Sequence, residues 1–113
     1  MSADCLFCRI VRKEIPATIV AEDDHSVAFR DIGPQAPTHV LVIPRQHVST
    51  LDAVQDPLLI GRLMTMAAEI ARKENIVDAG YRTVINTNGD GGQTVFHLHV
   101  HVLGGRRMTW PLG

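Results

Sequence analysis

Histidine and aliphatic residues alternate in the segment Phe96-His97-Leu98-His99-Val100-His101-Val102-Leu103. Successive side chains of a β-strand point to opposite faces, so this period of two predicts a strand, over residues 94–103. Its three histidines would share one face, about 7 Å apart along the strand, while the aliphatic residues would point into a core. Imidazole acts as nucleophile, acid, base or metal ligand near neutral pH, so the row predicts chemistry.

Three explanations are open for this row. A structural role would require a polar partner for each buried imidazole. A zinc site built from all three is disfavoured, because alternate residues of one strand stand too far apart and too nearly collinear to reach one ion. A catalytic row is favoured, and the loop before it agrees. Residues 88–94, Asn-Gly-Asp-Gly-Gly-Gln-Thr, offer unobstructed backbone N–H groups that suit a phosphate.

Around the histidine strand the sequence predicts four more strands, over residues 18–21, 26–30, 39–43 and 81–87. The run at 39–43 is almost wholly apolar and is ended by Pro44, which is typical of a central strand. Residues 88–92 predict a glycine-rich turn, and residues 106–113 an irregular tail.

Two helices are predicted. A short one spans residues 5–13, with Asp4 as its N-cap, and a long one spans 57–75, where Asp56 is the N-cap and Pro57 the first residue. The apolar stripe of the long helix predicts core packing; it comprises Leu59, Leu63, Met66, Ala67 and Ile70. The predicted fold class is α+β, an antiparallel sheet of about five strands with one long and one short helix.

Composition narrows the class of protein. A length of 113 residues predicts one domain, residues 1–113, and a net charge of −1 argues against a nucleic-acid partner. No apolar run reaches the ~20 residues of a membrane span, and the first residues lack the features of a secretory signal. We therefore expect a cytoplasmic protein without membrane association.

The two cysteines of the chain, Cys5 and Cys8, form a C-x-x-C motif. A disulfide is disfavoured in a chain without a secretory signal. A thioredoxin-like redox pair would follow a βαβ pattern, which is missing before this motif. Two buried free thiols remain an alternative. A metal site is favoured, provided that histidines supply two further ligands.

Several motifs together resemble the histidine triad (HIT) family. The segment from His97 to Leu103 resembles the signature of the family, and further similar segments are Phe29-Arg30-Asp31-Ile32, Pro34-Gln35-Ala36-Pro37-Thr38-His39, Val42-Ile43-Pro44, Gly91-Gly92-Gln93-Thr94 and Gly104-Gly105-Arg106…Trp110-Pro111. The resemblance covers nearly the whole chain and favours the branch of purine nucleoside phosphoramidases over that of diadenosine-polyphosphate hydrolases. It implies a homodimer that cleaves the P–N bond of a purine nucleotide (AMP- or GMP-like) linked to an amine.

The resemblance also implies a role for individual residues. His99 would be the nucleophile that forms a nucleotidyl-histidine intermediate, His101 would hydrogen-bond the phosphate, His97 would support the row, and His39 would orient or shuttle protons. Asp31 would bind both ribose hydroxyls. Residues that would hold phosphate oxygens are Asn86, Gly92, Gln93 and Thr94. Apolar residues that would form the purine slot are Phe7, Ile10, Ile15, Phe29, Ile32 and Leu41, and Trp110 would also contact substrate.

In a subset of the family an N-terminal C-x-x-C joins two histidines in a structural zinc site. The matching positions are Cys5, Cys8, His47 and His97, a sensible tetrahedral set for Zn²⁺. Catalysis itself would require no metal. Two rival functions stay open: a nucleotide-binding regulatory protein whose hydrolysis is incidental, and a zinc protein whose histidines serve the metal.

Overall fold

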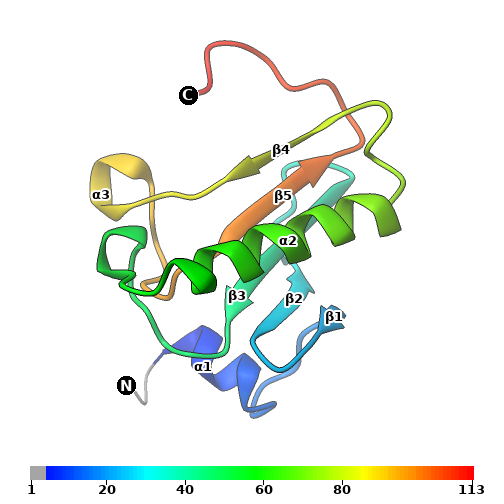
Figure 1. Cartoon of the computed structure of the whole chain (residues 1–113). Coiled ribbons are helices and arrows are strands. Elements are labelled where there is room, and N and C mark those ends of the chain that lie inside the picture. Colours follow the sequence, from blue (N-terminus) through cyan, green and yellow to red (C-terminus); the bar gives the residue numbers. More distant parts are fainter. Residues whose placement is uncertain (1–4) are drawn as a thin grey trace.

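Five antiparallel strands form one sheet in the order β1-β2-β3-β5-β4 in the computed structural model, which describes residues 5–113 (Figure 1). The strands are β1 (Ile19–Glu22), β2 (Ser26–Arg30), β3 (Thr38–Pro44), β4 (Tyr81–Val84) and β5 (Val100–Gly104). The helices are α1 (Leu6–Val11), the 3₁₀ helix η1 (Leu51–Ala53), α2 (Pro57–Lys73) and α3 (Asn88–Gly91). The predicted α+β class is confirmed, with α3 as an additional short helix.

The two faces of the sheet carry separate hydrophobic clusters. α2 lies across one face (Figure 1), where Leu63 and Ile70 pack on Ala28, Val40 and Val100. α1 covers the other face through Phe7 and Ile10, which pack with side chains from β2 and β3 (Val27, Phe29, Leu41, Ile43). All seven residues of β3 are therefore buried, as the apolar run at 39–43 predicts.

The helix ends differ in how well the sequence predicts them. Asp56 caps α2, because its carboxylate accepts the N–H of Leu58 at 3.0 Å, and Pro57 is the first helical residue, as predicted. At α1 the cap is Cys5, whose Sγ accepts the N–H of Cys8 at 3.3 Å. The predicted cap, Asp4, lies outside the described residues.

The predicted strand over residues 94–103 is wrong at its start, since β5 begins only at Val100. Continued pairing would place Leu98 opposite Pro44, which has no N–H to donate, and the N–H of Leu98 donates instead to the carbonyl of Val48 at 2.7 Å. The alternation nevertheless persists across this break. Leu98, Val100 and Val102 all join the cluster beneath α2, while the histidines face the side of α1.

Other boundaries shift by a few residues. β4 ends at Val84 rather than at residue 87, and the predicted glycine-rich turn is the helix α3, which is capped at its C-terminus by Gly92 with φ of +86°. Gly92 adopts this left-handed conformation without steric cost. No helix within residues 5–113 has both the length and the hydropathy that crossing a membrane requires.

We predict that Leu63→Ala lowers the free energy of unfolding by about 2–5 kcal/mol, because it leaves a cavity at a side chain that is 0% exposed. The matched control is Leu51→Ala, the same truncation at a side chain that is 40% exposed in η1. Chemical denaturation of both variants measures the difference. Equal losses at the two positions would contradict the packing described for α2.

Candidate active site and metal cluster

Four histidines from β3, from β5 and from the segment leading into β5 lie side by side on the α1 face of the sheet. The rings of His99 and His101 are 5.0 Å apart, and those of His101 and His39 are 5.2 Å apart. Phe7 of α1 meets His99 edge-to-face at 5.1 Å and His97 at 6.0 Å. The structure therefore brings together all four residues that the sequence predicts as catalytic.

Backbone groups determine which nitrogen carries the proton in three of these imidazoles, those of His97, His99 and His39. A carbonyl oxygen can only accept, so Nδ1–H of His99 donates to the carbonyl of His97 at 2.7 Å. Nε2 of His99 is left with an unprotonated lone pair, which is what a nucleophile requires. In the same way Nε2–H of His97 donates to the carbonyl of Pro44 at 2.8 Å, and its Nδ1 is left as an acceptor.

His39 and His101 form a second chain of hydrogen bonds. The backbone N–H of Gln35 donates to Nδ1 of His39 at 3.0 Å, so the proton of this ring is on Nε2. Nε2–H of His39 donates to Nδ1 of His101 at 2.9 Å, which places the proton of His101 on Nε2. That Nε2–H is buried and has no hydrogen-bond partner within the described residues. Such a donor is costly until a ligand pairs with it.

Burial favours the neutral form of three members of the row, His97, His101 and His39. Desolvation lowers the pKa of His97 to about 4 and that of His101 to about 4, and for His101 the neighbouring His99 and His39 act in the same direction. Burial also lowers the pKa of His39, and the carboxylate of Asp31 partly opposes this shift. A neutral imidazole both donates and accepts a hydrogen bond, so these three residues suit a hydrogen-bonded relay at neutral pH.

The low pKa of His101 predicts a pH dependence of stability. Between pH 6.5 and 4 the unfolded chain binds a proton at this residue and the folded chain does not, so stability falls as pH decreases through this window. The expected contribution to the slope is about 1.4 kcal/mol per pH unit. In denaturation at several pH values, His101→Gln should flatten the slope. The exposed control His25→Gln should not, and an unchanged slope in His101→Gln would contradict the argument.

A cleft of about 830 Å³ opens beside α1 and the ends of β1 and β2. It is lined by all six residues predicted for the purine slot, which are Phe7, Ile10, Ile15, Phe29, Ile32 and Leu41. Asp31 and Thr94, predicted to bind ribose and phosphate, line it as well. Apolar walls with few polar groups are typical of a small-molecule site, and this volume suits a nucleotide.

The loop predicted to bind phosphate is organised differently from the expectation. The N–H groups of Gly92 and Gln93 donate to the carbonyls of Gly89 and Asn88, both at 3.0 Å, so neither points freely at a ligand. The buried side chain of Gln93 accepts the N–H of Asn88 and donates to the carbonyl of Ser49. Gln93 therefore supports the loop structurally. In the sequence, the feature that could have indicated this structural role is a glutamine that directly follows two glycines.

Two further predicted residues lie away from the lining of the cleft. Asn86 is half-buried between β4 and α3, and Trp110 is 81% exposed in the C-terminal tail. Their roles stay predictions. Two groups that the sequence does not predict are the backbone N–H of Gln35 and the carbonyl of Pro44, which orient His39 and His97. No side-chain pattern reports on them, because any residue supplies a carbonyl and any residue but proline an N–H.

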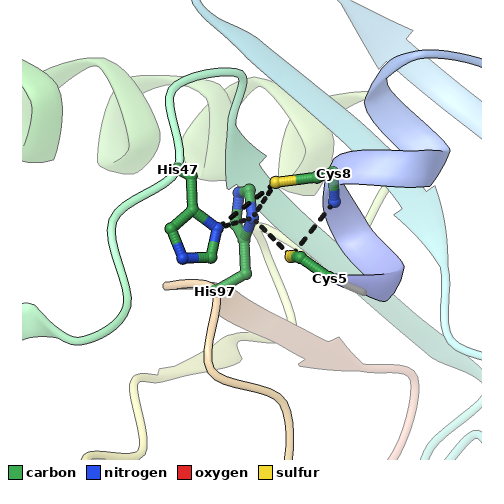
Figure 2. A group of neighbouring side chains, drawn as sticks. All are labelled: Cys5, Cys8, His47 and His97. Atoms are coloured by element: carbon green, nitrogen blue, oxygen red, sulfur yellow. Dashed lines mark hydrogen bonds between the residues drawn. The ribbon is translucent and has the colours of Figure 1, made fainter. Parts of the chain in front are cut away.

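Cys5, Cys8, His47 and His97 converge at the start of α1, as Figure 2 shows. Cys5 Sγ lies 3.3 Å from His97 Nδ1, Cys8 Sγ lies 3.3 Å from His47 Nδ1, and the two Nδ1 atoms are 3.3 Å apart. The edges of a tetrahedron around zinc with these ligands measure about 3.3–3.8 Å. The unprotonated Nδ1 of His97 faces the sulfurs, so the four residues fit a metal ion.

A second group of possible ligands, Asp31, His39 and His101, lies in the histidine row. Here the nitrogen of His39 that faces the other two residues is Nε2, which carries the proton because Nδ1 accepts from Gln35. A protonated nitrogen cannot ligate a metal. This group is therefore a hydrogen-bonded relay, and the four-residue cluster of Figure 2 is the metal candidate.

Comparison with known proteins agrees with the fold and the site. The HIT domain model matches residues 12–108. The chain is 49% identical over its full length to the purine nucleoside phosphoramidase of Escherichia coli K12, of which it covers 93%. It is 52% identical to an uncharacterized HIT-like protein of Synechococcus elongatus over the full length of both. A HIT family hydrolase from Legionella pneumophila superposes with a TM-score of 0.95 at 51% identity, covering 97% of this chain and 100% of that one.

The chain therefore belongs to the histidine triad (HIT) family, as the motifs predict, and it is a hydrolase of that family.

Proposed function

We propose that this protein hydrolyses the P–N bond of purine nucleoside phosphoramidates through a nucleotidyl-histidine intermediate. The observation that carries the proposal is the protonation pattern of the row: His99 has an unprotonated Nε2, and its ring lies 5.0 Å from that of His101, which carries an unpartnered Nε2–H. A nucleophile next to a free donor suits a phosphoryl group, whose oxygens need donors as the phosphorus is attacked. The E. coli relative is named for this activity.

The mechanism has two balanced steps. Nε2 of His99 attacks the α-phosphorus, the P–N bond breaks, and the departing amine takes up one proton from water. Water then attacks the same phosphorus, the bond to Nε2 breaks, and the proton is returned as the nucleoside monophosphate forms. His101 donates to a phosphate oxygen throughout, His39 orients His101, and His97 orients His99 through its carbonyl.

The cleft supplies the specificity in this proposal. Phe7, Phe29 and Ile10 provide flat apolar surface for a base, and the carboxylate of Asp31 suits a pair of ribose hydroxyls. Thr94, and with it Asn86, Gly92 and Gln93 of the loop, would hold the phosphate, and Trp110 would contact the substrate as the family resemblance implies. Among these, Thr94 is the best supported, because it lines the cleft.

Turnover of adenosine, guanosine and cytidine phosphoramidates tests the proposal. Faster turnover of both purine compounds than of the cytidine compound, with release of the free amine, is the expected result. Tight binding of the purine nucleotide without turnover would favour the alternative of a nucleotide-binding regulatory protein. That alternative has some support because the cleft residues serve binding and catalysis alike.

We further propose that the four-residue cluster holds a structural Zn²⁺. Two thiolates and two imidazoles match the preferences of this ion, and four protein ligands leave no position for an activated water. The metal would hold Cys5 and Cys8 of α1 against His47 and His97, and so would supply fixed structure and no catalytic step. Both cysteines are free of disulfide bonds, which fits a reducing compartment such as the cytoplasm.

A homodimer completes the proposal. α2 and the edge strand β4 each leave an apolar side chain exposed: Leu58 is 61% exposed and Tyr81 is 37% exposed. A second copy of the chain would bury them across a two-fold axis. Sedimentation velocity that gives a monomer at micromolar concentration would contradict this assembly.

A further inference from the structure

Asp31 belongs both to the cleft and to the histidine row. Among those residues of the 5–113 range that line the cleft, it is the only acidic one. Its Oδ1 accepts the N–H of Gly33 at 2.7 Å, which holds the carboxylate in place. Its Oδ2 lies 3.5 Å from Nε2 of His39, and its side chain keeps 21% of its surface exposed. One carboxylate therefore faces the cleft on one side and the relay on the other.

The single proton on Nε2 of His39 faces two acceptors. Nδ1 of His101 lies at 2.9 Å, and Oδ2 of Asp31 lies at 3.5 Å. The second distance is too long for a good hydrogen bond, yet a carboxylate attracts the proton by its charge. Because the N–H of Gln35 blocks Nδ1 of His39, the ring cannot change tautomer to serve both acceptors. The proton is therefore shared unequally between His101 and Asp31.

We propose that Asp31 is a positioning residue that couples recognition of the ribose hydroxyls to the orientation of His101, an inference that rests on the hydrolysis proposed above. When two hydroxyl groups donate to the carboxylate, it attracts the proton of His39 less. That proton is then committed to Nδ1 of His101, and Nε2–H of His101 is held toward the phosphate. Without the hydroxyls, Asp31 competes for the proton of His39 and His101 is held less firmly.

The proposed coupling differs from simple recognition of the ribose in its effect on kcat. A ribose contact that serves binding alone changes KM and leaves kcat unaltered. A contact that orients His101 also changes kcat, because the orientation matters most in the transition state. Coupling between two sites usually amounts to about fivefold or more, so a loss of about five- to tenfold in kcat is expected without the hydroxyls.

The test compares adenosine and 2′,3′-dideoxyadenosine phosphoramidates in the wild type and in His39→Gln. In the wild type, loss of the hydroxyls should lower kcat by about five- to tenfold as well as raise KM. In His39→Gln the residual kcat should no longer depend on the hydroxyls, while KM still does. Asp24→Asn, which removes an exposed carboxylate in the β1–β2 turn, is the control and should behave as the wild type.

Two results would overturn the coupling: a wild-type effect confined to KM, or an unchanged kcat effect in His39→Gln. Nitrogen-15 NMR of the histidines supplies a readout that is independent of turnover and of the variant. Adding adenosine monophosphate to the wild type should shift the nitrogen-15 resonances of the His101 ring toward the values of the Nε2–H tautomer. Adding the dideoxy nucleotide should shift them less. If the wild type turns over neither substrate, the proposed hydrolysis fails, and the NMR comparison alone decides the coupling.

Discussion

His99→Ala should abolish turnover while the protein still binds nucleotide. The variant removes the only imidazole of the row whose Nε2 is unprotonated and oriented by a backbone carbonyl. Loss of the nucleophile in covalent catalysis costs about 10⁴-fold or more in kcat. Binding should survive because the cleft residues, with Phe7 among them, are unchanged. Steady-state kinetics and calorimetric titration with nucleoside monophosphate measure the two effects.

The matched control for this variant is His25→Ala, which removes an exposed histidine in the turn between β1 and β2 and should retain wild-type turnover. Mass spectrometry of quenched reactions should detect the nucleotidyl adduct on the wild type and on His25→Ala only. Turnover by His99→Ala within tenfold of the wild type would refute the assignment of the nucleophile.

The second large effect concerns the metal. Protein purified without a histidine tag should contain about one zinc per chain, held by Cys5, Cys8, His47 and His97. At free zinc near 100 times the dissociation constant, binding stabilises the folded state by about 2.7 kcal/mol. Chelation should therefore lower the melting temperature by about 10 °C or more. Elemental analysis and thermal unfolding with and without chelator test both statements.

Cys8→Ser should lose both the metal and the stability that metal binding supplies, whereas His25→Ala should lose neither. Phe7 lies between the two cysteines in the sequence, contacts His99 and itself lines the cleft. Loss of the metal should therefore weaken nucleotide binding through α1 more than it slows the chemical step. Zinc below half an equivalent, with both thiols freely titratable, would leave Cys5 and Cys8 as packing residues.

Local patterns were sufficient to predict those elements that are stabilised by their own residues. The bounds of β2 and the start of α2 agree with the sequence because a short apolar run, an aspartate cap and Pro57 act within a few residues. The start of β5 could not be predicted in this way. It depends on Pro44, which is distant in sequence and lacks the N–H that would continue the ladder to Leu98.

The same distinction, between features set by local residues and features set by distant ones, applies to the candidate site. Side-chain types and the family resemblance predicted the histidine row, the cleft and the metal cluster, because each needs particular residues. The protonation pattern was beyond the sequence, since it depends on where the chain brings a carbonyl or an N–H against a ring. Likewise, the internal hydrogen bonds of Gly92 and Gln93 depend on α3, which the run of glycines does not predict.

The contacts that set the protonation pattern have a consequence for how readily the enzyme can acquire new substrates. His97, His99 and His39 are oriented by backbone atoms of Pro44, His97 and Gln35, and such atoms are not altered by most substitutions. The walls of the cleft, by contrast, consist of replaceable side chains, of which Ile32 is fully exposed. Mutational drift or directed evolution at the walls can thus change which base is accepted, while the protonation and orientation of the reactive nitrogen stay the same.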